Sequence, residues 1–202
     1  MAYSDINIAN RALQKLGAAS ITSFNDASNN ARAINVAYNQ VRDAELRRHR
    51  WKFAIVRTTL PALSAAPLSG VYSLQYQLPA NCLRVLDVGD YWPGADVSDY
   101  RNRPVAEYSV EGGLILTNIA APLSLRYIQQ VTNPGMFDSS FCESLAARLA
   151  LEICEQLTQS GDKRKLAMQE YKNAIKEAIV ANALESPPEF KADDTWMMAR
   201  IQ

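Results

Sequence analysis

The stretch VRDAELRRHRWKFAIVRTTL, residues 41–60, carries a helical pattern through a basic cluster and directly into a strand pattern. Upstream, apolar residues recur at the spacing of one helix face, at Ala31, Ile34, Tyr38 and Val41. Downstream, Phe53, Ile55 and the β-branched residues that follow favour an extended backbone. The sequence therefore predicts a helix over about 27–50, followed almost at once by a strand.

The other side of this expected helix is polar. Asp26 or Ser28 can serve as its N-cap, because both side chains accept hydrogen bonds from the free N–H groups of a first helical turn. Asn39, Gln40 and Arg42 lie off the apolar face. We expect these three side chains to face water.

The basic cluster RRHRWK, residues 47–52, ends the helix. Positive charge at a helix C-terminus is favoured by the helix macrodipole, and this interpretation needs no ligand. A second interpretation gives Arg47, Arg48, Arg50 and Lys52 a role in binding. Both interpretations stay open at this point.

Three further helices are expected from amphipathic periodicity. The first runs from Ser4 or Asp5 to Leu16, with Gly17 as its stop. A third follows a cap at Asp138 or Ser139 and is expected to end at Gly161. Its buried stripe is expected at Cys142, Ala146, Leu149, Ile153 and Leu157. The fourth covers about 162–184, and its inward side is expected to hold Met168, Tyr171, Ile175 and Ala178.

The middle of the chain, residues 52–131, reads as strands. Proline and glycine recur there too often for long helices. Strand patterns lie at 53–60, 71–78, 83–88, 105–110, 114–117 and 123–131. Gly112 and Gly113 separate two of these runs, and their freedom at positive φ predicts a tight hairpin. Closely spaced strands without intervening helices favour a small antiparallel sheet or barrel.

The order of these patterns predicts an α+β fold. Residues 1–51 and 132–185 supply the two halves of a helical bundle, and residues 52–131 form an inserted antiparallel β domain. Residues 186–202 form an extended C-terminal arm, because Pro187 and Pro188 forbid continuation of the last helix.

The arm carries more apolar anchors than a free polar terminus needs. These are Phe190, Trp196, Met197, Met198 and Ile201. One interpretation is that the arm docks on a neighbouring subunit or on a partner ring, with Trp196 as the main anchor. The other is that it folds back on its own bundle.

Composition excludes several function classes. The chain has 21 Lys+Arg and 21 Asp+Glu, so its formal net charge is zero and any nucleic-acid contact must come from a local patch. No signal peptide and no apolar run of spanning length is found, which predicts synthesis in a cytoplasm and no membrane partner. Cys82, Cys142 and Cys154 lack the spacing of a disulfide framework or zinc site.

A search for catalytic chemistry finds almost nothing. His49 is the only histidine, and the arginines around it disfavour its protonation and leave it without an orienting carboxylate. Phosphate-cradling glycine motifs are absent. The acidic pairs, Asp87 with Asp90, Asp96 with Asp99, and Asp193 with Asp194, read as solvated carboxylates. We therefore expect no enzyme, no cofactor and no metal site.

Three features resemble the tail tubular protein A family, the head-to-tail adaptors of short-tailed bacteriophages. They are an opening helix with NRAL at 10–13 and Leu16-Gly17, a second helix rich in Asn and Ala over 29–35, and the exit RWKF at 50–53. The later order of elements, strands followed by two closing helices, is also similar to that of the family. The resemblance covers nearly the whole chain.

The resemblance implies a virion structural protein, made in the host cytoplasm and located at the portal–tail junction. Copies would form a dodecameric ring that joins the portal protein to a nozzle protein of the tail tubular protein B type. The ring would line the channel through which double-stranded DNA leaves the capsid, touching phosphates transiently and without sequence specificity. In that setting Arg47, Arg48, Arg50 and Lys52 are candidates for the DNA channel or for the subunit interface.

A second hypothesis from the residues is a small nucleic-acid-binding module. Here the β domain is a barrel, residues 47–52 form its basic rim, and tyrosines of the strands stack on bases. The same tyrosines can fill the core of a small sheet, and we favour that packing because few basic residues are interleaved with them.

Overall fold

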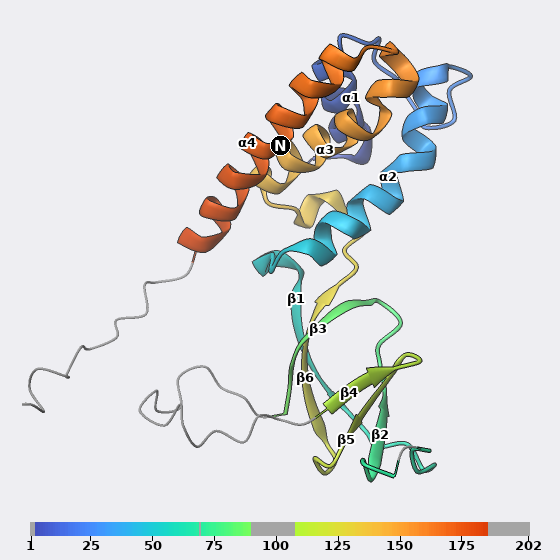
Figure 1. Cartoon of the computed structure of the whole chain (residues 1–202), viewed down its shortest axis with the longest axis vertical. Coiled ribbons are helices and arrows are strands. Elements are labelled where there is room, and N and C mark those ends of the chain that lie inside the picture. The colour runs from blue at the N-terminus through green and yellow to red at the C-terminus, as the bar shows by residue number, and fades with distance from the viewer. Residues whose placement is uncertain (1–2, 69, 90–107, 186–202) are drawn as a thin grey trace, which may run out of the picture.

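Four helices lie at one end of the molecule and six strands at the other in the computed structural model, which describes residues 3–68, 70–89 and 108–185 (Figure 1). The helices come from both ends of the chain, and the strands lie between them in sequence. The fold is α+β, as the sequence predicts. The expected arm, residues 186–202, lies outside the described residues.

The first two helices begin and end where the capping residues indicate. Helix α1 spans Asp5–Leu16: Ser4 accepts a hydrogen bond from the backbone N–H of Asn7, and Gly17 follows with φ 69°. Helix α2 spans Asn29–Arg48, with the Ser28 side chain accepting from the backbone N–H of Ala31. Of the two expected caps of α2, Ser28 is therefore the one used. Asp26 instead accepts hydrogen bonds from the backbone N–H groups of Thr22 and Ser23.

The boundary between the last two helices corrects one prediction. Helix α3 spans Ser139–Thr158 and is capped by Asp138, and helix α4 spans Gly161–Leu184. Gln159, with φ 49°, is the left-handed residue that ends α3. Gly161 does not end a helix; it is the first residue of α4, because the Ser160 side chain accepts from the backbone N–H of Lys163 and starts the next helix.

Helix α3 lies at the centre of the bundle and packs on α1, α2 and α4. Its buried stripe contains four of the five predicted residues, while Leu157 is half-buried and packs at the edge of the core. On α4, Tyr171 and Ala178 point inward as predicted and Ile175 is half-buried. Met168 does not point inward: 43% of its surface is exposed.

Arg42 also differs from its prediction. It is 6% exposed, because its guanidinium is paired inside the structure. Its Nε lies 2.9 Å from Asp43 Oδ1, and its Nη1 lies 3.0 Å from Asn39 Oδ1. Asp43 is held in turn by Gln130, whose Nε2 donates to Asp43 Oδ2 at 2.6 Å. The polar side of α2 therefore contacts the segment that follows β6, through the hydrogen bond from Gln130 to Asp43.

The strands form two antiparallel sheets of three strands each. One sheet has the order β1-β6-β3, from Ile55–Leu60, Leu123–Gln129 and Cys82–Val88. The other has the order β2-β5-β4, from Leu74–Gln77, Leu114–Thr117 and Tyr108–Glu111. The predicted hairpin is confirmed: Val110 pairs with Ile115, and Gly112 and Gly113 make the turn with φ 56° and 81°.

Strand boundaries shift by a few residues from the sequence pattern. Residues 52–54 form a 3₁₀ turn, so β1 starts two residues later than expected. The first part of the expected strand 71–78 is loop, and the strand expected over 105–110 is described only from Tyr108 onward. Residues 105–107 lie outside the described part of the chain.

Two apolar cores hold these layers together. The larger core fills the bundle and receives Leu86, Ile128 and Val131 from the strand region. The smaller core lies between the two sheets and consists of Leu60, Tyr76, Val88, Ile115, Leu123, Leu125 and Tyr127. Tyr76 and Tyr127 thus serve packing, as we favoured, and not base stacking. The sheet β1-β6-β3 contributes to both cores and joins the strand region to the helices.

Candidate functional site at the junction of helices and sheet

Trp51 anchors the place where α2 passes into β1. Its side chain is 1% exposed, and its ring centroid lies 4.9 Å from that of Phe141 and 6.3 Å from that of Phe53. Its indole N–H donates to the backbone carbonyl of Glu45 at 2.9 Å. Both its apolar face and its polar atom are therefore satisfied, and the path of the chain after α2 is fixed.

Two arginines tie the end of α2 to β3. The Arg47 guanidinium donates to the backbone carbonyl of Leu83. In return, Arg84 Nη1 lies 3.2 Å from the carbonyl oxygen of Arg47 and 3.4 Å from that of Arg48. These are carbonyls of the last turn of α2, which have no partners within the helix. Arg47 and Arg48 place positive charge in this last turn, as the macrodipole interpretation expects, but it is Arg84 that donates to the free carbonyls. Arg84 belongs to the same cluster but comes from a strand, so the local sequence did not reveal it.

Arg48 enters a buried polar network with Glu45 and Tyr171. Glu45 is 2% exposed. The Tyr171 hydroxyl lies 2.9 and 3.0 Å from the two Glu45 carboxylate oxygens and donates to this carboxylate, while it accepts a hydrogen bond from Arg48 at 2.7 Å. The guanidinium groups of Arg48 and Arg148 lie 5.9 and 5.5 Å from the centre of the Tyr171 ring. The network joins α2, α3 and α4.

Burial dominates the electrostatics of this network. It raises the pKa of Glu45, and the Tyr171 hydrogen bond and the two arginines oppose that rise. Burial, together with the nearby Glu45 charge, raises the pKa of Tyr171 to about 12, so its hydroxyl keeps its proton at neutral pH. Burial also lowers the pKa of His49, with Arg48 and Arg84 adding to the effect. The shift disfavours protonation of His49, in the direction that the neighbouring arginines predict.

Asn182 holds the segment after the cluster against the end of α4. Its Nδ2 donates to the carbonyl oxygen of Arg50 at 3.1 Å, and its Oδ1 accepts from the backbone N–H of Lys52 at 2.9 Å. Lys52 Nζ lies 3.3 Å from the carbonyl oxygen of Ala183. The Arg50 side chain is exposed, and within residues 3–68, 70–89 and 108–185 its guanidinium has no hydrogen-bond or ion-pair partner.

We expect Asn182→Ala to lower the free energy of unfolding by about 1–2 kcal/mol, because it leaves a backbone N–H and a backbone carbonyl without their partners. Asn173→Ala is the matched control, since Asn173 is exposed on the same helix. Both changes gain the same helix propensity. Urea denaturation of the two variants measures the difference, and equal midpoints would contradict a bridging role for Asn182.

Of the four basic residues predicted as a site, the structure brings three into contacts within the chain. Arg47 and Lys52 donate to backbone carbonyls, and Arg48 donates to Tyr171. Arg50 is exposed, and of the four it alone has no hydrogen-bond or ion-pair partner among the described residues. The second predicted group, Phe190, Trp196, Met197, Met198 and Ile201, lies outside the described residues.

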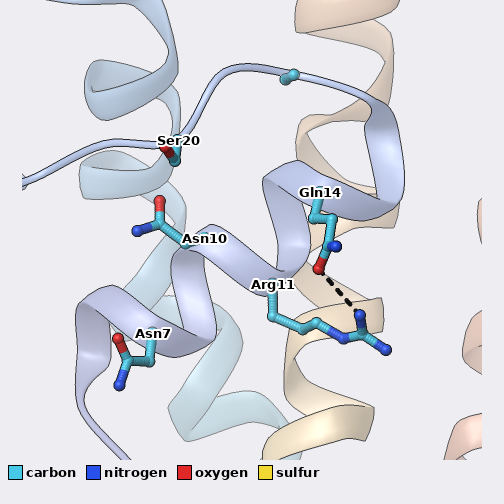
Figure 2. Close-up of a pocket in the computed structure, with 6 residues that line it drawn as sticks. Asn7, Asn10, Arg11, Gln14 and Ser20 are labelled. Atoms are coloured by element: carbon cyan, nitrogen blue, oxygen red, sulfur yellow. Dashed lines mark hydrogen bonds between the residues drawn. The ribbon is translucent and has the colours of Figure 1, made fainter.

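A pocket of about 470 Å³ opens over α1 and the loop that follows it (Figure 2). Asn7, Asn10, Arg11, Gln14, Ala18 and Ser20 line it. Arg11 is engaged with Gln14, 3.0 Å away, and with Glu143 on α3 at 3.0 and 3.1 Å. The Asn10 amide exchanges two hydrogen bonds with the backbone of Ile21. Arg11 and Asn10 thus fix α1 to α3 and to the loop that follows it.

The cysteines and the acidic pairs are the remaining candidates from the sequence, and those that the structure describes are buried, half-buried or paired within the fold. Cys142 and Cys154 are buried and Cys82 is half-buried, and burial raises the pKa of Cys142 to about 12. Asp87 is not simply solvated, because it forms an ion pair with Arg126 at 3.1 Å. The other five aspartates of the acidic pairs lie outside the described residues. Within the described part of the chain, no cluster of three or more His, Cys, Asp or Glu side chains could hold a metal ion.

Comparison with known proteins gives no assignment: no family model matches the chain, and no curated protein does so either. None of the described helices has both the length and the apolar character needed to span a membrane.

Proposed function

We propose that this chain is a virion structural protein, a head-to-tail adaptor whose copies form a ring between the portal and the tail nozzle and line the DNA exit channel. The observation that supports the proposal best is the arrangement of the elements. Helices from both ends of the chain form one bundle, and a two-sheet unit inserted between them lies at the opposite end of the subunit (Figure 1). This is the organisation that the resemblance to the adaptor family implies.

Such a subunit has two ends of different character, which suits a ring that must contact two different rings. The β1–β2 loop lies at the end of the sheet unit that faces away from the helices (Figure 1). It exposes Leu63, Leu68 and Val71. Exposed apolar side chains grouped in this way are typical of a protein contact surface. We assign this end to the nozzle protein, and the bundle to the portal and to the neighbouring subunits.

The charge distribution supports a channel that does not retain DNA. The formal net charge is zero, and a strongly basic channel would hold the phosphates and impede passage. Three of the four basic candidates are engaged within the chain, so Arg50 is the one left to touch a phosphate or an acidic residue of a neighbouring copy.

Arg50→Glu is expected to reduce the amount of ring formed on a portal by about tenfold if Arg50 lies in the subunit interface, because a repulsive charge there opposes association. If Arg50 faces the channel, rings form normally and the rate of DNA ejection changes. The control is Arg32→Glu, the same charge change at an exposed position of α2. Counting rings by electron microscopy and timing ejection separates the two cases, and a variant that behaves as wild type in both assays contradicts any role of Arg50 in the ring.

The direct test of the proposal is the mass of the purified chain by light scattering, alone and then mixed with a portal ring from the same source. A portal-bound ring supports the adaptor function. A chain that stays monomeric and ignores the portal contradicts it. Salt-sensitive binding of short DNA by that monomer would favour the nucleic-acid-binding module instead.

A further inference from the structure

The last two turns of α4 expose an apolar patch. Ile179, Val180 and Leu184 have 38%, 59% and 78% of their surfaces exposed, and Ala183 between them is exposed as well. The inward side of the same helix is covered by the bundle through Tyr171 and Ala178. We call Ile179, Val180, Ala183 and Leu184 the α4 patch.

The surroundings of the α4 patch are basic. Lys176 is exposed one turn before Val180, and Lys172 is exposed one turn earlier. Lys52 Nζ contacts the carbonyl oxygen of Ala183 itself, and the backbone of the exposed Arg50 is held by Asn182 in the last turn of α4. Glu177 and Glu185 are the acidic residues of this stretch of α4. A segment that combines apolar anchors with acidic residues would complement this surface.

The chain itself carries such a segment directly after the patch. Residues 186–202 contain Phe190, Trp196, Met197, Met198 and Ile201. The half nearest to α4 is acidic, with Glu189, Asp193 and Asp194 against Lys191. Pro187 and Pro188 prevent α4 from continuing, so the segment starts directly after the helix that carries the patch.

The length of the segment suffices for it to run back along α4. The patch spans six residues of helix, roughly 9 Å at 1.5 Å per residue. The eight residues from Pro188 to Trp196 reach up to about 26 Å when extended. Because the segment is joined to the helix by only a few residues, its effective concentration at the patch is in the millimolar range. A second copy of the chain has to reach the same surface from solution.

We propose that residues 189–198 of each chain dock on the α4 patch of the same chain, with Phe190 and Trp196 over Val180 and Leu184 and with the acidic residues beside Lys172 and Lys176. The contact covers the patch in the free protein. It is a property of the single chain, so it holds or fails independently of the proposed ring.

The test is cross-linking in the full-length protein without a portal. Lys176→Cys and Thr195→Cys place thiols beside the patch and beside Trp196 while leaving the apolar side chains in place, in a background where Cys82→Ser removes the half-buried native thiol. A short bismaleimide is expected to link the two positions within one chain, at a yield that does not depend on protein concentration. The control pairs Thr195→Cys with Gln40→Cys, an exposed position on α2.

Amide hydrogen exchange gives a second readout. In the full-length double variant Phe190→Ser/Trp196→Ser, exchange in the last two turns of α4 is expected to be faster by about tenfold than in the wild type, because the segment no longer covers them. Links formed only between chains, with a yield that rises with concentration, would overturn the proposal and assign the segment to a neighbouring copy. A yield no greater than that of the control pair, or unchanged exchange, would also overturn it.

Discussion

Trp51→Ala is expected to lower the free energy of unfolding by about 3–5 kcal/mol, a large part of the roughly 5–15 kcal/mol that holds a typical domain together. The reason is the position of the side chain. Trp51 is 1% exposed and packs on Phe141, Phe53 and His49 at the point where α2 passes into β1. Its removal leaves a cavity between the bundle and the sheets and frees the backbone carbonyl of Glu45. Urea denaturation followed by circular dichroism measures the loss.

Trp51→Phe is the matched control for this prediction. It keeps an aromatic ring in the cavity and removes the indole N–H that donates to Glu45. We expect it to cost about 1–3 kcal/mol, distinctly less than the alanine variant. If the alanine and phenylalanine variants unfold at the same urea concentration, the ring contacts do not hold the junction and its stability comes from the polar contacts around it.

The sequence predicted the parts of this fold that depend on local chemistry. The helix caps and the turn at Gly112 and Gly113 follow from rules that span a few residues. The structure confirms the turn, and of the two caps expected for each helix it uses Ser28 and Asp138. Gly161 was wrong because two local rules compete there. Ser160 is a good N-cap and starts α4, and Gln159 adopts the left-handed conformation that ends α3.

Contacts between distant residues could not be read from periodicity. Arg42 was expected in water because of its position on the helical wheel. That position does not reveal that Asp43 and Asn39 accept hydrogen bonds from its guanidinium. Nor does it reveal that Gln130, 87 residues from Asp43, donates to the Asp43 carboxylate. The basic cluster was recognised, but its partners in the fold were not. Arg84 donates to the Arg47 carbonyl and Tyr171 accepts from Arg48, and both lie 36 or more residues from the end of α2 in sequence. A candidate site made of charged residues is therefore the hardest feature to interpret from the sequence alone.

Tyr171→Phe is expected to lower the free energy of unfolding by about 3 kcal/mol near pH 7, because it leaves the Glu45 carboxylate buried without its hydrogen-bond donor. The effect depends on pH. Burial raises the pKa of Glu45 in the folded state, so the folded protein holds this proton more tightly than the unfolded chain does. The stability contributed by Glu45 is fully present below its unfolded pKa of about 4.3 and is lost as pH rises through the higher folded pKa.

The Tyr171 hydrogen bond lowers the pKa of Glu45, so its removal raises that pKa further. Tyr171→Phe should therefore lower the free energy of unfolding little near pH 4 and most near neutral pH. In the variant, the loss of stability with rising pH should extend over a wider pH range than in the wild type. Urea denaturation from about pH 4 to about pH 8 measures this dependence. Tyr171 itself does not titrate in this range, because its pKa is raised to about 12.

Tyr76→Phe is the control, since it removes a buried tyrosine hydroxyl that donates to the neutral carbonyl oxygen of Ile119 at 2.7 Å. We expect it to cost about 1 kcal/mol at every pH in that range, because no carboxylate is involved. A Tyr171→Phe variant with the same flat profile would contradict the network. It would mean that Arg48, 2.7 Å from the Tyr171 hydroxyl in the native structure, moves onto Glu45 and replaces the lost hydrogen bond with a direct ion pair.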